Sequence, residues 1–152
     1  MLELIRRVPP EQRLDVIMVD GNGLLHPRRC GAACHLGVLA DIPSIGVAKN
    51  YYCSIPATPS RDELKDRARR ELCGMGDYFF IEDADDGFVY GAAVKSSEGS
   101  TNPIYVSVGH RLALQDCIDI CLKCCSNESR VPEPIRRADH GTRELMRSHL
   151  EM

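Results

Sequence analysis

The sequence has no apolar run of membrane-spanning length and no excess of positive charge. Its 152 residues include 19 Lys and Arg against 22 Asp and Glu, which gives a formal net charge of −3. The first absence excludes a predicted membrane-spanning helix, which needs about 20 consecutive apolar residues. The second argues against a protein that coats nucleic acid without specificity. A local basic groove stays compatible with it, because net charge does not report how charge is distributed.

Signals for secretion and for a zinc site are also lacking. The opening Met-Leu-Glu-Leu-Ile-Arg-Arg places its basic residues after a short apolar stretch, which is not the order of a signal peptide. The eight cysteines are therefore expected to be free thiols rather than a disulfide framework. Cys121-Leu-Lys-Cys124 is formally a CxxC pair, but no second Cys/His pair follows at zinc-finger spacing. Half of the thiols are expected to pack as small hydrophobic side chains.

The length suits one domain, residues 1–152, with a core of its own. Periodicity predicts helices over 1–7, 31–40, 112–125 and 133–149, and a solvated helix or linker over 61–70. Strands are predicted over 16–20, 44–49, 78–81, 88–94 and 104–109, with an irregular stretch at 51–59. The alternation predicts an α/β fold or a mixed layered sheet.

The most informative segment runs from Asp15 to Pro27 and contains Val-Asp-Gly-Asn-Gly. An apolar, β-branched run of strand length delivers the carboxylate of Asp20 to its C-terminal end, and two glycines follow at once. A metal ion, a phosphate or a base could approach Asp20 there without meeting side chains. The alternative is an ordinary strand that ends in a turn, since Asp, Asn and Gly are all common turn residues.

Two other motifs fit this segment poorly, and a further acidic segment is expected to be a turn. In an EF-hand loop, Leu24 and His26 would occupy ligand positions. In a dinucleotide-binding fingerprint, His26 would replace the third glycine. The acidic connection at 82–87 is expected to join a β-hairpin, because it lacks the ordered ligand spacing of a calcium loop.

Three predicted strand ends carry ionisable side chains. Asp20 ends the first strand with His26 beyond it, Lys49 ends the second, and His110 follows the last, next to Arg111. Functional groups in α/β sheets gather beyond the C-terminal ends of neighbouring strands, so these side chains are expected to lie close together. Such a set suits metal-assisted phosphodiester chemistry, because the carboxylate binds Mg²⁺, the ion activates water, and the lysine neutralises the phosphate.

The segments VDGNGLLHPRRCGAACHLGVLADIPSIGVAKN, VSVGHRLALQDCIDIC and VPEPIRRADHGTRE resemble the endonuclease V family in its eukaryotic form. The resemblance implies a ribonuclease H-like fold, with a mixed central sheet flanked by helices. It also implies an endonuclease with Mg²⁺ or Mn²⁺ as cofactor. Such an enzyme recognises inosine in RNA or DNA, prefers single-stranded RNA, and cuts the second phosphodiester on the 3′ side. Nucleus, nucleolus and cytoplasm are the compartments that this role would fit, with no membrane partner.

The resemblance assigns catalytic roles to residues of this sequence. Asp20 corresponds to the metal-binding aspartate of the Val-Asp-Gly motif, and Lys49 to the lysine of Gly-Val-Ala-Lys. His26 corresponds to the histidine of the His-Pro-Arg segment, and His110 to a histidine near the metal. For each residue alone an ordinary alternative stays open: His26 can cap a turn, Lys49 can be solvated, and His110 can be hydrogen-bonded at a helix entry.

Four further residues are expected to contact the substrate. Gly21 and Gly23 correspond to glycines that line the pocket for the hypoxanthine base, where their missing side chains make room. Arg28 and Arg111 are expected to contact the nucleic-acid backbone. Preference for RNA over DNA rests on the resemblance alone, because no contact to a 2′-hydroxyl can be recognised in the sequence.

The resemblance breaks at the start of the chain. The family has an earlier aspartate on its first strand, a glutamate near its first helix and a Pro-Tyr-Ile-Pro wedge, and no residue here matches these by motif. One carboxylate rarely holds Mg²⁺ well, so this polypeptide is expected to be inactive or weak. A sheet without its first strands is also expected to be marginally stable. The alternative function is a non-catalytic inosine- or nucleic-acid-binding remnant or isoform.

Overall fold

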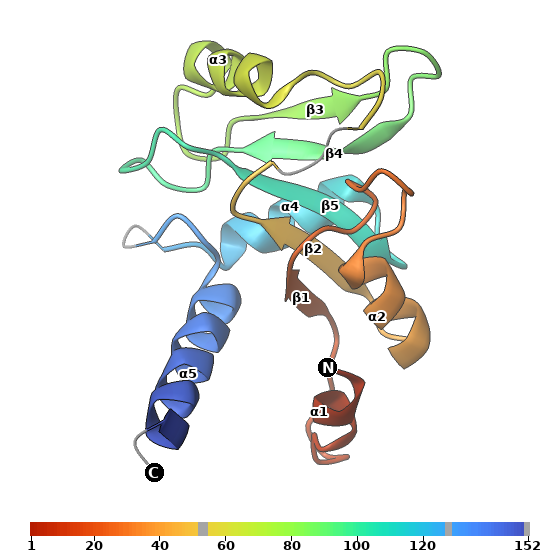
Figure 1. Ribbon diagram of the computed structural model, residues 1–152, viewed down its shortest axis with the longest axis vertical. Helices are drawn as coiled ribbons and strands as arrows, with labels where there is room; N and C mark the ends of the chain where they lie inside the picture. The colour runs from red at the N-terminus through yellow and green to blue at the C-terminus, as the bar shows by residue number, and fades with distance from the viewer. Residues whose placement is uncertain (52–54, 127–128, 151–152) are drawn as a thin grey trace.

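The computed structural model describes residues 1–51, 55–126 and 129–150 of the chain (Figure 1). Helices and strands alternate along it up to residue 71, and three consecutive strands and then two helices follow. The helices are α1 (Leu2–Arg6), α2 (Ala32–Ala40), α3 (Arg61–Glu71), α4 (Leu114–Lys123) and α5 (Glu133–Leu150). The strands are β1 (Ile17–Asp20), β2 (Ser44–Ala48), β3 (Tyr78–Glu82), β4 (Val89–Val94) and β5 (Ile104–His110). Among these described helices, none is long and apolar enough to cross a membrane.

The strands form one mixed sheet in the order β1-β2-β5-β4-β3. β1 and β2 run parallel, whereas β2 with β5, β5 with β4, and β4 with β3 are antiparallel pairs. The expected α/β architecture, a mixed central sheet with flanking helices, is therefore confirmed. β1 and β3 lie at opposite edges of the sheet, so a feature built on one edge is separated from the other edge by three strands.

The sheet separates two apolar layers, because successive side chains of a strand point to opposite faces. On one face, α3 packs Leu64 and Ala68 against Phe79 of β3. On the other face, α4 packs Cys117 and Ile118 against the inner strands. In Figure 1, α1 and α5 extend away from the same end of this layered body. This arrangement places α5 beside β1, where the first predicted site residue lies.

The charged segment at 61–70 is a helix and not a linker. Ser60 and Glu63 form a capping box: the Glu63 amide donates to the Ser60 hydroxyl at 3.3 Å, and the Ser60 amide donates to the Glu63 carboxylate at 2.7 Å. These bonds satisfy amides that the first turn leaves unpaired. Leu64 and Ala68, four residues apart, lie on the one buried face. The cap and this narrow apolar stripe together explain a helix in a strongly polar segment.

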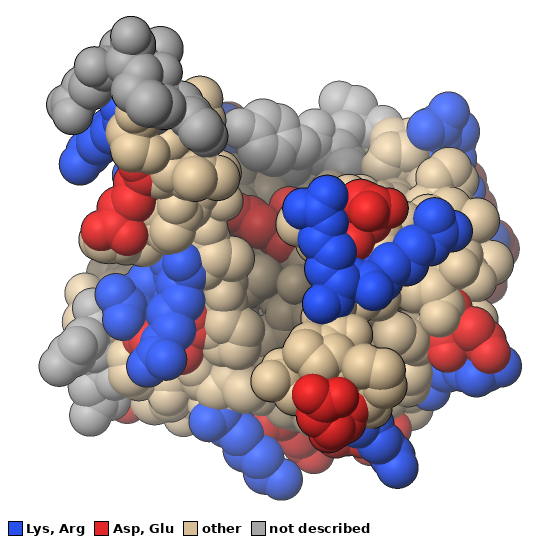
Figure 2. Space-filling model, turned by 90° about the horizontal axis from the view of Figure 1, so that it is seen from below, with Lys and Arg blue, Asp and Glu red and all other residues tan. Residues whose placement is uncertain are grey.

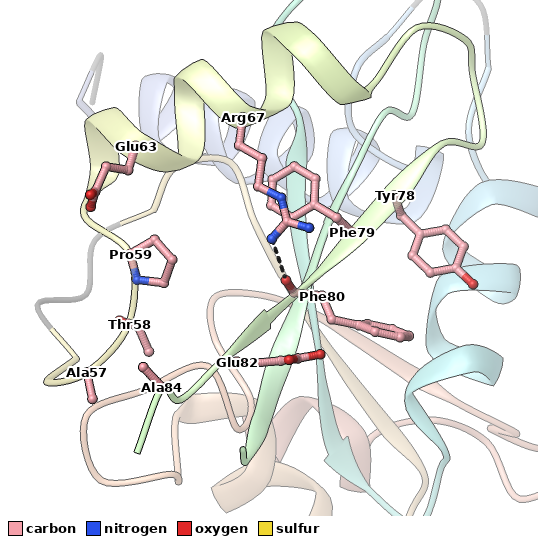
Figure 3. A pocket seen from close by; sticks show the side chains of 10 residues that line it. All are labelled: Ala57, Thr58, Pro59, Glu63, Arg67, Tyr78, Phe79, Phe80, Glu82 and Ala84. Carbon is pink, nitrogen blue, oxygen red and sulfur yellow. Dashed lines mark hydrogen bonds between the residues drawn. The ribbon is translucent and has the colours of Figure 1, made fainter. Parts of the chain in front are cut away.

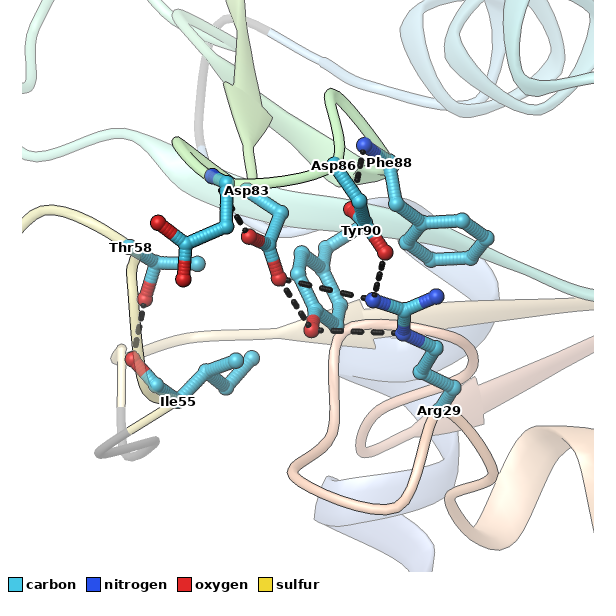
Figure 4. Close-up of polar contacts among 8 residues, drawn as sticks. Arg29, Ile55, Thr58, Asp83, Asp86, Phe88 and Tyr90 are labelled. Atoms are coloured by element: carbon cyan, nitrogen blue, oxygen red, sulfur yellow. Dashed lines mark hydrogen bonds and ion pairs between the residues drawn. The ribbon is translucent and has the colours of Figure 1, made fainter.

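The acidic connection between β3 and β4 is the turn of a hairpin, as predicted. The two strands pair from Tyr78 opposite Val94 onward, and the Asp83 amide donates to the Phe88 carbonyl at 2.9 Å. Gly87 adopts φ +70°, a left-handed conformation that glycine reaches without a Cβ penalty. The turn carboxylates of Asp83 and Asp86 bind the guanidinium of Arg29 (Figure 4).

The described cysteines are free thiols, as the sequence predicts. Cys117 and Cys121 are fully buried in the core beneath α4. Burial raises the pKa of Cys117 to about 12 and that of Cys125 to about 11, because a thiolate is poorly solvated there. These thiols therefore stay protonated and pack as hydrophobic side chains. Cys53 falls outside the described residues.

Candidate active site

The parallel pair β1–β2 brings Asp20 and Lys49 together. Asp20 lies opposite Val47, and Lys49 follows two residues later on the same face of the sheet. The Lys49 Nζ donates to Asp20 Oδ2 at 2.9 Å. The Lys49 side chain is 29% exposed and that of Asp20 is 47% exposed, so the pair is shielded but open to a ligand. The predicted meeting of these two strand ends is therefore present.

A second carboxylate, which the motif analysis did not single out, completes this cluster. Asp139 of α5 lies with its Oδ2 at 3.5 Å from Lys49 Nζ. Arg143 holds the same carboxylate, with Nη2 at 2.9 Å from Oδ2 and Nε at 3.2 Å from Oδ1. One sequence signal could have found it: Asp139 follows the buried Ile135 by four residues, which places both on the packed face of the helix.

Lys49 is the charged centre of the cluster. The hydrogen bond to Asp20 raises the pKa of Lys49, and the negative charges of Asp20 and Asp139 add to this effect against a smaller opposing effect of burial. The ammonium is therefore charged at every physiological pH. Asp20, Lys49 and Asp139 are called the acid–lysine cluster below.

The acid–lysine cluster borders a groove of about 470 Å³ between α1, β1, α2 and α5, with Asp20 and Asp139 among its lining residues. Figure 2, seen from below, shows the molecule hollowed on this side. Most of the lining is apolar, including Ile17, Met18 and Leu36. The two carboxylates are thus polar groups at the margin of an apolar depression, where electrostatic interactions are stronger than in open water.

Asp20 and Asp139 have the chemistry to hold a Mg²⁺ or Mn²⁺ ion. Mg²⁺ is commonly bound through one or two carboxylates and keeps water or substrate phosphate as its other ligands. Within residues 1–51, 55–126 and 129–150, no group of three or more His, Cys, Asp or Glu side chains is arranged to hold a metal. The donor set therefore fits an ion that shares its coordination with water or phosphate rather than one enclosed by protein ligands.

His110 does not join the acid–lysine cluster, so the expected meeting of three strand ends is wrong. β5 runs antiparallel to β2, and His110 lies opposite Ser44 at the start of β2, whereas Lys49 follows its end. His110 Nε2 lies 3.8 Å from Asp41 Oδ1, and Arg111 pairs with the same carboxylate at 2.7 Å. The rule that strand ends converge holds for parallel neighbours only, and the sequence did not reveal the direction of β5.

The segment that carries the predicted glycines lies across β2 and β5. The Gly21 amide donates to the Val47 carbonyl at 3.1 Å, and the Gly23 amide donates to the Ser107 hydroxyl at 2.9 Å. A Cβ on Gly23 would overlap the Val108 carbonyl oxygen, so this glycine is required for backbone packing. At Gly21 a Cβ would be in ordinary contact with Val19 at 3.9 Å and with Ala32 at 4.0 Å. Of the two glycines, only Gly21 leaves room for a methyl group.

His26 and Arg28 lie on the outer part of the same segment. The Arg28 amide donates to His26 Nδ1 at 3.2 Å, and the Arg28 side chain is exposed. Among the described residues, no hydrogen bond or ion pair joins His26 to Asp20 or Lys49. His26 thus makes the local turn contact that the ordinary interpretation predicts, and Arg28 is free to reach a phosphate.

Arg29, which the sequence did not single out, anchors this segment to the β3–β4 hairpin (Figure 4). Its Nη2 lies 2.6 Å from Asp86 Oδ2 and 3.4 Å from Asp83 Oδ2, and its Nε donates to the Tyr90 hydroxyl at 3.3 Å. The guanidinium also lies over the Phe88 ring, 4.1 Å from its centre. The acidic turn thus provides the partners for an arginine on the site-bearing segment.

The fold and the cluster define a class of protein: an α/β protein in which two parallel strands end at a carboxylate and a lysine, and a helix adds a second carboxylate. The model of the family described as Endonuclease V matches residues 1–140. The chain is 41% identical over 150 residues to Endonuclease V of Homo sapiens and 39% identical over 153 residues to that of Mus musculus. These alignments cover 99% of this chain and 51% and 44% of the relatives, so the chain spans about half their length.

Solved structures agree with the sequence comparison. The crystal structure of the catalytic domain of human Endonuclease V matches with a TM-score of 0.91 at 39% identity, covering 99% of this chain and 60% of that one. Ciona intestinalis Endonuclease V, in complex with a 24mer DNA containing an inosine followed by a ribo-adenosine, matches with a TM-score of 0.87 at 34% identity, covering 97% and 61%. The chain belongs to the endonuclease V family.

Proposed function

We propose that this chain carries the catalytic carboxylates and the phosphate-binding lysine of a metal-dependent endonuclease that acts on inosine-containing nucleic acid. The observation that carries the proposal is the acid–lysine cluster, in which Lys49 lies between Asp20 and Asp139. Family membership supports an endonuclease, and the inosine-containing DNA bound to the Ciona relative supports inosine as the recognised base.

The residues of the cluster have distinct roles in this proposal. Asp20 and Asp139 would hold Mg²⁺ or Mn²⁺, which supplies water activation and charge stabilisation at the leaving oxygen when bound. Lys49 would pair with a non-bridging phosphate oxygen and stabilise the charge that grows during cleavage. Arg28 would bind an adjacent phosphate, and the backbone at Gly21, which carries no side chain, would lie against the base.

Three finer features of the proposal rest on the family resemblance. We propose single-stranded RNA as the preferred substrate, with cleavage at the second phosphodiester 3′ to inosine, and a location in the nucleus, nucleolus and cytoplasm. Because the cluster contains two carboxylates rather than one, we expect weak activity instead of none. Because a phosphate from the substrate can complete the coordination of Mg²⁺, the polypeptide is expected to bind the ion weakly when free and more tightly with nucleic acid.

The test uses the whole chain with end-labelled single strands that contain one inosine or one adenosine, as RNA and as DNA. We expect slow cleavage of the inosine strand in Mg²⁺ or Mn²⁺ and its loss in Asp20→Asn. Asp62→Asn is the matched control, because Asp62 is an exposed aspartate on α3 outside the cluster. Equal cleavage of the adenosine strand, or cleavage that Asp20→Asn leaves intact, would contradict the proposal.

A non-catalytic inosine-binding protein is the second candidate. The absence of a group of three or more metal-binding side chains among the described residues favours it. It predicts preferential binding of inosine RNA over adenosine RNA in a metal chelator, with no cleavage when metal is restored. A binding titration followed by a cleavage assay on the same preparation separates the two candidates.

A further inference from the structure

The free edge of β3 presents backbone groups that the sheet does not use. Among the strands that the structure describes, β3 lies at the edge and has β4 as its single neighbour. The Lys95 amide donates to the Asp77 carbonyl at 2.8 Å, so Asp77 faces β4. Antiparallel pairing alternates along a strand, hence Phe79 and Ile81 also face β4, while the amide and carbonyl of Phe80 point outward. The Arg67 Nη1, 3.4 Å from the Phe80 carbonyl oxygen, confirms this direction.

A groove of about 640 Å³ lies along this edge. Figure 3 shows it between β3, the segment at 57–59 and the start of α3. The Ala84 amide donates to the Ala57 carbonyl at 2.7 Å and closes one end. Arg67 contributes a long hydrogen bond to Phe80 from an exposed part of its side chain, which an incoming amide can displace. The edge is thus bordered but not covered.

The outward face of β3 is aromatic. Tyr78 and Phe80 are each 37% exposed, with ring centres 5.5 Å apart, although aromatic residues are only 5% of the sequence. In Figure 3 both rings point away from α3, on the same side as Glu82. Tyr78 is held by its hydroxyl, which donates to Gln115 of α4 at 2.8 Å. The pair is a preformed apolar surface that loses little entropy when it is covered.

The charge of the groove is negative. Glu63 and Glu82 are both exposed and line it. Arg67 is the basic residue of the lining, and Glu71 already neutralises it at 3.0 and 2.9 Å, while its guanidinium lies 4.1 Å from the centre of the Phe79 ring. A polyphosphate strand would meet two carboxylates here without a free cation, whereas a chain carrying Lys or Arg would be attracted.

We propose that the groove at the edge of β3 binds an extended segment of a partner protein by strand addition. The outward backbone groups of Phe80 pair with the added strand, apolar side chains of that strand cover Tyr78 and Phe80, and a Lys or Arg pairs with Glu82. The site lies at the opposite edge of the sheet from β1 and the acid–lysine cluster. A partner held there leaves the cluster accessible, so the two sites can be occupied together.

The test is binding of the fluorescent peptide Thr-Lys-Thr-Val-Thr-Val-Thr-Lys-Thr, whose Val and Lys side chains share one face of a strand, to the whole chain, followed by anisotropy and by amide chemical shifts. We expect shifts centred on residues 78–82, and loss of binding when alternate peptide amides are N-methylated, because these cannot pair with an edge. Glu82→Lys is expected to weaken binding about threefold or more. Glu11→Lys makes the same charge change on an exposed residue far along the chain and is expected to leave binding unchanged.

Four results would overturn the proposal. The first is equal binding of the N-methylated peptide, which would show attraction by charge alone. The second is chemical shifts centred on α1 and α5 instead of β3. The third is tighter binding of single-stranded RNA to residues 78–82 than of the peptide. Self-association of the chain that Glu82→Lys abolishes would also count against it, since the occupant would then be a second copy.

Discussion

At the scale of single residues, the candidate site depends on Lys49 and its two carboxylates. Asp20 comes from β1 and Asp139 from α5, 119 positions later in the sequence. Lys49 offsets the repulsion that would separate the two negative charges in the absence of a cation. The lysine therefore holds the two carboxylates close together.

The first prediction concerns metal binding by Asp139. Asp139→Asn removes one of the two carboxylates and is expected to weaken Mn²⁺ binding about tenfold. A Mn²⁺ titration followed by electron paramagnetic resonance measures the change. Asp62→Asn serves again as the control and should bind Mn²⁺ as the unmodified chain does. Unchanged affinity in Asp139→Asn would show that this carboxylate is only a partner of Lys49 and Arg143.

The second prediction separates the two glycines that follow Asp20. Gly23→Ala forces a methyl group into the Val108 carbonyl and is expected to lower the free energy of unfolding by more than about 2 kcal/mol. Gly21→Ala places its methyl group in ordinary contact with Val19 and Ala32 and is expected to cost less, while it adds bulk at the backbone proposed to lie against the base. Urea unfolding should therefore show Gly23→Ala as the less stable variant. Binding of inosine RNA, compared per folded molecule, should show Gly21→Ala as the weaker binder.

At the scale of elements, the site depends on how the segment at 21–31 is held. Arg29 adopts φ +50°, an uncommon conformation for a residue with a side chain, and is kept there by Asp86, Asp83 and Tyr90. The β3–β4 hairpin, which supplies these partners, lies at the opposite edge of the sheet from β1. This hairpin and β2, whose Val47 carbonyl accepts the Gly21 amide, thus hold the two ends of the segment.

The third prediction is a pH dependence of this contact. The hydrogen bond from Arg29 lowers the pKa of Asp86 below its usual 3.8. The pair therefore stabilises the fold above that value, and the contribution is lost as the pH falls through the lowered pKa. Arg29→Gln is expected to lower the melting temperature at neutral pH and to differ less from the unmodified chain near pH 3. Thermal unfolding at both values measures this, and a constant difference would contradict it.

The fourth prediction concerns the cap of α3. Ser60→Ala removes the hydroxyl that accepts the Glu63 amide and is expected to lower the free energy of unfolding by about 1 kcal/mol. Glu63→Ala in the Ser60→Ala background should add little, because the two bonds form one reciprocal cap. Thr101→Ala, an exposed hydroxyl outside any helix, is the control. Full additivity of the double variant would show that the two bonds act separately.

At the scale of the whole molecule, the net charge of −3 bears on the proposed binding of nucleic acid. Lys49 and Arg28 are the basic residues that the proposal places on phosphate, and the base provides the remaining contacts. Lys49 follows β2 and contacts Asp20 at the end of β1. Arg28 adjoins Arg29, which binds the carboxylates of the β3–β4 hairpin, so the two proposed phosphate contacts lie apart on the molecule.

The fifth prediction follows from the small number of proposed phosphate contacts. Inosine RNA is expected to bind with a shallow salt dependence, equivalent to about two or three phosphate contacts, between about 50 and 200 mM salt. The ratio of affinities for inosine and adenosine RNA should stay constant over this range, because base contacts are not screened. Anisotropy titrations at several salt concentrations measure both quantities. A slope typical of many phosphate contacts would point to a basic surface that the described residues do not show.

The elements could be predicted from the sequence because each has a local cause. Apolar runs marked β1, β2 and β5, an acidic turn marked the β3–β4 hairpin, and periodicity marked α2, α4 and α5. The segment at 61–70 stayed open as a helix or a linker, since its buried stripe is narrow. The direction of β5 was not predictable, because strand direction depends on which strands pair and not on local residue types.

Three features could be predicted from the order of the amino acids: Asp20 ends a strand, Lys49 ends the next, and the chain resembles one family of endonucleases. These are local facts, since they follow from side-chain alternation and from motifs of adjacent residues. The tertiary structure alone decided that Asp139 joins the pair, that His110 lies at the other end of the sheet, and that Gly23 serves packing. Each of these depends on contacts between segments far apart in sequence, which composition and spacing do not specify.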